Sequence, residues 1–189
     1  MLWGMGVIGA WGQSWEAAPI SDRARELNEQ AAVAEGRAAI RLYAQAIRAD
    51  ESNGAAWHGL GMCLLEEGRA EDAYKAFRRL NKLYPDQPMA LSALAAAMVR
   101  MPGLTRDQLR EGLNLAERAA NLAPEDGETW YVLSVVRHAN GDYERALAAA
   151  RRARMSDESG DGVSPEVRKL HQQQEVACLD AIAVFSPLD

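Results

Sequence analysis

The chain has 189 residues, 48% of them hydrophobic and 25% charged, which is typical of one folded domain or a short repeat array and excludes a disordered or fibrous chain. Its formal net charge of -6 argues against nucleic acid as the main partner, because nucleic-acid binding needs a basic face. There are 35 alanines but only 15 valines and isoleucines together. Alanine favours helices and β-branched residues favour strands, so we expect an all-α protein.

Residues 1–19 form an apolar tail rich in tryptophan and glycine, in which Glu16 is the first charged residue. The segment lacks the basic start of a signal peptide and the roughly 20 apolar residues of a transmembrane helix. Three interpretations stay open. The segment is disordered or docked on the protein itself, it ends a targeting sequence, or it anchors the chain to a partner or a bilayer interface. The anchoring side chains would then be Trp3, Trp11 and Trp15.

Segment 54–87 has the pattern of two packed helices. The first helix has an apolar face formed by Trp57, Leu60, Gly61 and Leu64. The second has an apolar face formed by Ala73, Phe77 and Leu80. We expect Gly61 to lie where the two helices approach closely, Gly68 to end the first helix and Pro85 to end the second. The pattern resembles the tetratricopeptide repeat (TPR), a helix–turn–helix unit of about 34 residues.

The same pattern recurs on both sides of this segment, which predicts repeats at 20–53, 54–87, 88–126 and 127–160. In the last repeat Trp130 takes the place of Trp57, and Gly141 that of Gly68, but Arg137 stands where a large apolar residue is expected. The third repeat is 39 residues long. Its extra residues fall between 100 and 109, as a tolerated loop or as a partner-specific projection, and Thr105 to Gln108 resembles a capping box. The first repeat is degraded, so residues 22–49 are either a helix pair or one long helix with a soft kink.

A final segment, 161–189, is expected to hold a C-terminal capping helix and a tail. Ser164 is a typical N-cap, and Pro165 is typical of the first helical position. A rough apolar stripe follows, formed by Val167, Leu170, Ala177, Ala181 and Phe185. We expect this helix to cover the open face of the last repeat, and its apolar end is a candidate contact with a neighbouring chain.

The resemblance implies a right-handed α-solenoid of about four repeats, whose first helices line a concave groove that holds a peptide or a helix of a partner. The residues expected to face that groove are His58, Met62, Leu65, Met89, Ser92, Ala96, Val99, Tyr131, Val135 and His138. This set is apolar with few charges. The cationic carboxylate clamp of the family's co-chaperones is missing, with Asn28 its only match. An apolar peptide or an amphipathic helix is therefore the expected ligand, unless the protein's own apolar tail fills the groove.

Catalysis is not expected, because the chain has no phosphate-binding loop in context, no metal-spaced cysteine and histidine set and no nucleophile elbow. Cys63 and Cys178 are too few for a disulfide framework, and we expect no cofactor and no metal. Two hypotheses remain. One is a non-enzymatic scaffold or adaptor, bacterial in composition and cytoplasmic. The other is a structural subunit of a larger assembly, membrane-associated or periplasmic, held through its tryptophan-rich N-terminus.

Overall fold

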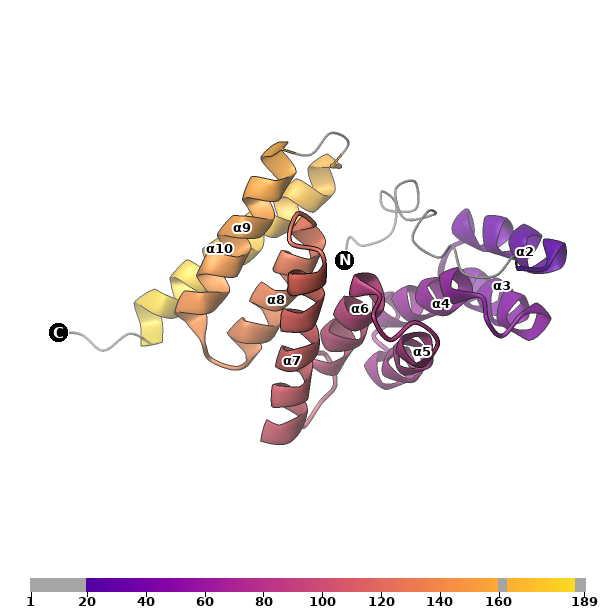
Figure 1. The fold of residues 1–189 in the computed structure, drawn as a ribbon, viewed down its shortest axis with the longest axis horizontal. Coiled ribbons are helices and arrows are strands. Elements are labelled where there is room, and N and C mark those ends of the chain that lie inside the picture. Colours follow the sequence, from indigo (N-terminus) through magenta and orange to yellow (C-terminus); the bar gives the residue numbers. More distant parts are fainter. Residues whose placement is uncertain (1–19, 160–162, 186–189) are drawn as a thin grey trace. The chain divides into compact units, whose positions relative to one another are not determined.

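The computed structural model describes residues 20–159 and 163–185, and these residues form α-helices and no strand (Figure 1). Eight of the helices follow one another as four antiparallel pairs, and a ninth completes the described part of the chain. The helices are α2 (Asp22–Ala32), α3 (Gly36–Ala49), α4 (Gly54–Glu66), α5 (Ala70–Leu83), α6 (Pro88–Met98), α7 (Arg106–Leu122), α8 (Gly127–Ala139), α9 (Tyr143–Ser159) and α10 (Pro165–Phe185). The expectation of an all-α helical repeat is confirmed.

The chain divides into two compact units, the first up to Pro85 and the second from Asp86 onward. In the first unit α4 packs between α3 and α5. Two glycines on α4 make this packing possible: a Cβ on Gly59 would lie 2.3 Å from the ring of Tyr43, and a Cβ on Gly61 would lie 2.4 Å from the ring of Phe77. Both distances are far shorter than a normal carbon–carbon contact, so these two positions require glycine.

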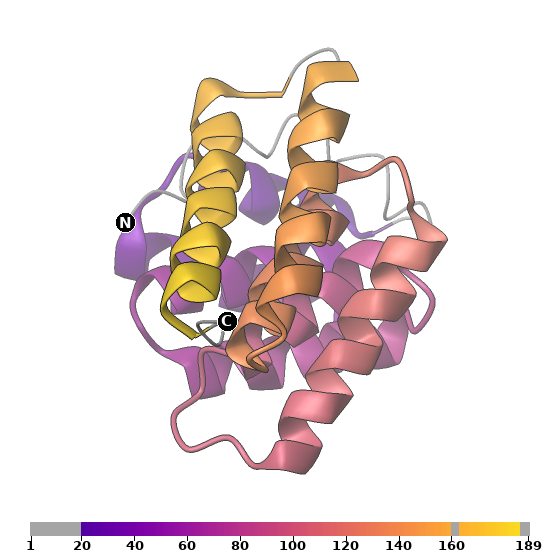
Figure 2. The same ribbon diagram turned by 90° about the vertical axis from the view of Figure 1, so that its left-hand side faces the viewer.

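The second unit packs α6 on α7, α7 on α8, α8 on α9 and α9 on α10, and α6 also contacts α8. Helix α6 is buried over most of its surface, as its sequence of alanine, leucine and methionine predicts. Figure 2 shows α9 and α10 lying side by side and antiparallel, so α10 covers the outer side of the last helix pair. The expected capping position of this helix is therefore present in the structure.

Trp57 and Trp130 occupy matching environments in the two units. The indole nitrogen of Trp57 donates to the carbonyl of Glu51 at 3.0 Å, and that of Trp130 donates to the carbonyl of Pro124 at 2.8 Å, six residues upstream in both cases. Gly68 and Gly141, which follow the same two first helices, have φ of 73° and 78°. These left-handed conformations end the helices as the repeat pattern predicted.

Three local features explain positions at which the sequence departs from the repeat pattern. α2 and α3 are separate helices with a break at 33–35, so the first repeat is a helix pair and not one kinked helix. Thr105 and Gln108 form the expected capping box, through which α7 gains extra residues at its start. Arg137, in place of an apolar residue, forms an ion pair of 3.0 Å with Glu117.

The N-terminal segment with Trp3, Trp11 and Trp15 lies outside the described residues, as do 160–162 and 186–189. Among the helices of the described ranges, none has both the length and the apolar character needed to cross a membrane.

Candidate functional site

In the first unit the predicted partner-binding residues lie on α4. His58, Met62 and Leu65 are half-buried, and each comes from one side of the helix, three or four residues apart. Asn28 of α2 is engaged within the protein, because its side-chain amide exchanges hydrogen bonds of 3.2 and 3.3 Å with the amide of the buried N-cap residue Asn53. The one side chain that could have matched a carboxylate clamp therefore serves helix packing.

His58 keeps this face of α4 uncharged. Its ring lies 5.9 Å from the ring of Phe77, centroid to centroid, at an angle of 51°. Burial lowers the pKa of His58 to about 4, because the charged imidazolium would lose its hydration. At neutral pH the α4 face consequently offers a partner a neutral imidazole, a thioether and a leucine.

In the second unit the predicted residues lie on α6 and α8, which pack against each other. Met89 and Ala96 on α6 and its C-cap residue Val99 are half-buried. Ser92 is 4% exposed, so it lies within the packed helices and is not open as expected. Its hydroxyl has no hydrogen-bond partner among the described residues, although helical serines commonly bond the preceding turn.

Tyr131 departs from the expectation more clearly, because α10 covers it. Its side chain is 7% exposed, and its ring stacks on the ring of His171 with centroids 4.9 Å apart. Val135 and His138 on α8 remain half-buried, and the His138 ring meets the edge of Tyr143 at 5.1 Å. The α8 face open to a partner is thus shorter than predicted and begins after Tyr131.

Helix α10 contacts α8 and α9 through side chains that the sequence pattern did not single out. The amide of Gln174 donates to the hydroxyl of Ser134 at 3.3 Å, and the thiol of Cys178 lies 3.7 Å from the same hydroxyl. His171, which does not belong to the expected apolar stripe, is 1% exposed and lies 2.8 Å from the carboxylate of Asp157. These partners are 14 or more residues apart in the chain, so no local motif links them.

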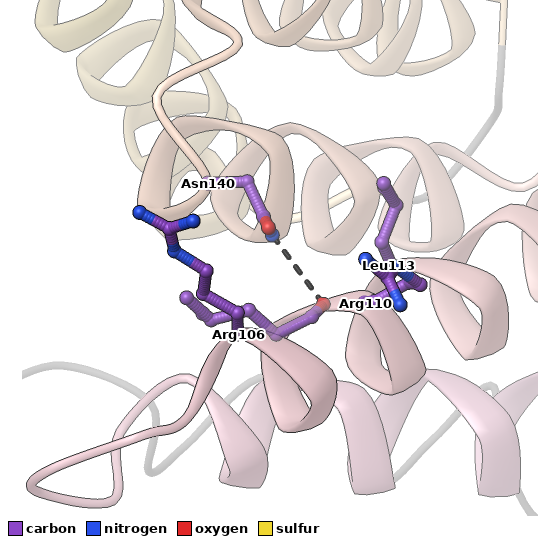
Figure 3. A pocket seen from close by; sticks show the side chains of 5 residues that line it. Arg106, Arg110, Leu113 and Asn140 are labelled. Carbon is purple, nitrogen blue, oxygen red and sulfur yellow. Dashed lines mark hydrogen bonds between the residues drawn. The ribbon is translucent and has the colours of Figure 1, made fainter.

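A hollow of different character lies at the start of α7 (Figure 3). It has a volume of about 400 Å³ and is lined by Arg106, Leu109, Arg110, Leu113 and Asn140. The side-chain amide of Asn140, at the end of α8, donates to the carbonyl of Leu109 at 3.5 Å and fixes one wall. Arg106 belongs to the extra residues of the third repeat, between 100 and 109, for which the sequence predicts either a tolerated loop or a partner-specific projection. The structure places it on a helix, at the edge of a basic hollow.

We find no arrangement that indicates metal or acid–base chemistry on these faces. Within 20–159 and 163–185, no three histidine, cysteine or acidic side chains gather in a way that could hold a metal ion. Cys63 is half-buried, and burial raises the pKa of its thiol to about 11, so this thiol is poorly reactive at neutral pH. What the faces offer is apolar contact area.

Two models of the tetratricopeptide repeat family match the chain, one over residues 32–97 and the other over residues 104–161. A curated relative is the cytochrome c-type biogenesis protein CycH of Rhizobium meliloti (strain 1021). It is 27% identical over 136 residues, which are 72% of this chain and 33% of that protein. The chain therefore spans about a third of the length of the curated relative that it matches.

Solved structures of three proteins share the fold. A thermophilic TPR protein of Thermus thermophilus, TTC0263, is 17% identical with a TM-score of 0.64, and the match covers 85% of each chain. MamA of Desulfovibrio magneticus RS-1, residues 41 to the end, is 16% identical with a TM-score of 0.58, over 89% of this chain and 100% of that one. Yeast Tom70 is 15% identical with a TM-score of 0.63, over 87% of this chain and 34% of that one.

Proposed function

The chain belongs to the tetratricopeptide repeat family, and we propose that it is a non-enzymatic scaffold that binds an apolar peptide or an amphipathic helix of a partner protein. The binding surfaces are the exposed faces of the first helices, α4 in one unit and α6 with α8 in the other. The observation that carries this proposal is the half-buried, uncharged set of side chains on these faces, typified by Met62, Val99 and Val135.

The chemistry of these faces selects the class of ligand. A partner side chain such as leucine or phenylalanine would gain about 1.5–3 kcal/mol by burial against them. The neutral His58 adds no charge that would favour an acidic tail.

The test compares substitutions on the binding faces with one on a second helix. We expect Met62→Asp and Val135→Asp, one in each unit, each to weaken partner binding about tenfold or more, because a carboxylate replaces about 1.5–3 kcal/mol of apolar contact. Ala148→Asp, on the exposed side of α9, is the matched control and should bind as the parent does. A photo-crosslinking amino acid at the same three positions, used in the native host, identifies the partner. Equal crosslinking from Ala148 and from Met62 would remove the first-helix faces from the proposal.

A second candidate is a subunit of an assembly for cytochrome c-type biogenesis, and the specific observation in its favour is the relative with that name. This candidate agrees with a membrane-associated location and with an anchoring role for Trp3, Trp11 and Trp15. We expect a host strain that lacks the gene to lose c-type cytochromes, measured as haem that stays bound to protein in denaturing gels. A strain expressing the chain without residues 1–15 should show the same loss if the anchor is needed. Normal cytochrome content in the gene-deleted strain would reject this candidate and leave the scaffold proposal standing.

A further inference from the structure

We propose that His171 of α10, together with Asp157 of α9 and Glu128 of α8, forms a protonation-dependent clasp that holds α10 on the α8–α9 face in mild acid and loosens it toward alkaline pH. The proposal concerns only the second unit and stands independently of the ligand proposed above. It explains why a histidine, and not an apolar residue, lies at the centre of this helix interface.

The clasp joins three helices at one buried ring. Nδ1 of His171 is 2.8 Å from the Asp157 carboxylate, and Nε2 is 3.7 Å from the Glu128 carboxylate. His171 is 1% exposed and Asp157 is 3% exposed, so water cannot replace the contact between them, whereas the Glu128 side chain is 21% exposed. Among the residues that the structure describes, Nε2 has no hydrogen-bond partner, so a neutral ring satisfies only one of its two nitrogens there. A protonated ring carries a donor on each nitrogen and a charge that both carboxylates attract.

All the charged and titratable groups around the ring favour its protonated form. Glu128 and the N-cap residue Asp126 approach from α8, and Asp157 approaches from α9. Tyr131 of α8 stacks on the ring as a neutral phenol, because burial raises its pKa to about 12. Burial alone lowers the pKa of His171, but the Glu128 and Asp157 carboxylates outweigh it, so its pKa lies above the ordinary value.

Apart from the clasp, α10 buries few side chains. Three of its residues are buried, His171, Cys178 and Ala181, and the last two are small. Its contacts with α9 include ion pairs of Glu175 with Arg151 at 3.0 Å and with Arg154 at 3.1 Å, and the Phe185 ring at its C-terminal end stacks on the Tyr143 ring with centroids 5.4 Å apart. Partly exposed ion pairs of this kind contribute little, and Phe185 is 67% exposed, so we expect the buried histidine ring to contribute substantially to the docking of α10.

The direction of the pH effect follows from the raised pKa. Docked α10 binds a proton more tightly than released α10 does, so docking is strongest below the pKa of the released histidine. It weakens as the pH rises through the higher pKa of the docked one. Release would uncover Tyr131 and Ser134, which extend the open face of α8 toward its N-terminal end.

The test uses the buried thiol of Cys178 in the full chain. Cys178 is 0% exposed under α10, so its alkylation by N-ethylmaleimide requires α10 to move. The alkylation rate is measured by mass spectrometry on the Cys178 peptide. Protection is the rate in the urea-unfolded chain divided by the rate in the folded chain at the same pH. This ratio removes the pH dependence that comes from thiolate formation. Between about pH 6 and about pH 8.5 we expect protection to fall about tenfold for each unit by which docking raises the histidine pKa. Cys63, in the other unit, serves as the internal control and should show no such fall.

Two histidine variants decide whether the effect belongs to the clasp. His171→Gln should make the protection of Cys178 independent of pH, whereas His138→Gln, at the other end of α8, should leave the fall unchanged. Constant protection in the parent chain, or an unchanged fall in His171→Gln, overturns the proposal. If His171→Gln does not fold, the ring signal of His171 in the parent chain is titrated by NMR. A midpoint below about 6.5, the ordinary histidine value, also overturns it.

Discussion

At the scale of single residues, the repeat depends on pairs of side chains that face each other, one on its first helix and one on its second. Position 61 needs a glycine because the Phe77 ring fills the space that a Cβ at this position would occupy. In the last repeat Ser134 stands at the position of Gly61, and Ala150 stands at the position of Phe77. A smaller side chain on the second helix thus accompanies a larger one on the first.

Gly61→Ala tests this packing against a second helical glycine. We expect the substitution to lower the free energy of unfolding by about 1–3 kcal/mol, because the new methyl group overlaps the Phe77 ring. Gly112→Ala is the matched control on α7, where the nearest atom to an added Cβ is 3.9 Å away. It should leave the stability unchanged or raise it by up to about 1 kcal/mol, since alanine favours helix.

Urea unfolding followed by circular dichroism measures both variants. Equal effects at the two positions would contradict the assignment of Gly61 to the closest helix approach. The sequence predicted this role of Gly61 from spacing, but it held no sign that Gly59 is equally constrained by Tyr43. The reason is that Tyr43 belongs to the preceding repeat, so the contact joins two repeats and not the two helices of one.

At the scale of helices, the sequence predicts where most helices begin and end, but it does not predict which helix faces are covered by α10. The caps at Thr105 and Ser164 and the stops at Gly68 and Gly141 depend on neighbours within a few residues, and the structure shows each of them. The separation of α2 from α3 could not be predicted, because the segment contains no proline and its glycine, Gly36, lies two residues later than the repeat pattern requires. In the structure Gly36 has a φ of 51° and directly follows the break at 33–35.

For the candidate site, too, the sequence predicts local features and not contacts between distant parts of the chain. Residues such as Met62 and Val135 could be proposed from their position beside the apolar face of a first helix. The loss of Tyr131 from the open surface could not, because it depends on where α10 packs. Repeat periodicity fixes the face on which a residue lies, but coverage of that face by α10 depends on contacts 14 to 44 residues apart, such as His171 with Asp157 and Ser134 with Cys178.

At the scale of the whole molecule, two of the three histidines lie in different units, and they respond to pH in opposite directions: His58 is half-buried on α4, and His171 is buried under α10. In the first unit, burial lowers the pKa of His58 to about 4. The unfolded chain therefore binds a proton that the folded unit rejects, and stability falls as the pH drops from the ordinary histidine value toward 4. In the second unit His171 has a raised pKa, so docking of α10 strengthens as the pH drops.

We therefore expect hydrogen exchange, corrected for its intrinsic pH dependence, to change in opposite directions in the two units between about pH 8 and about pH 5. Peptides from α4 and α5 should lose protection toward acid, by more than about 1 kcal/mol, since one pKa unit is worth about 1.4 kcal/mol. Peptides from α10 should gain protection over the same range. Burial also raises the pKa of Glu66, which acts against His58 because a protonated carboxyl group favours the folded unit in acid.

The difference between the parent chain and His58→Gln isolates the histidine contribution from that of Glu66. In His58→Gln, peptides of α4 and α5 should keep their protection in acid, while those of α10 behave as in the parent. His138→Gln should alter neither response, because this half-buried ring lies at the end of α8, against Tyr143. A loss of protection in α4 and α5 that persists without His58 would show that another group governs the first unit. The uncharged character of its binding face would then no longer follow from a histidine held neutral by burial.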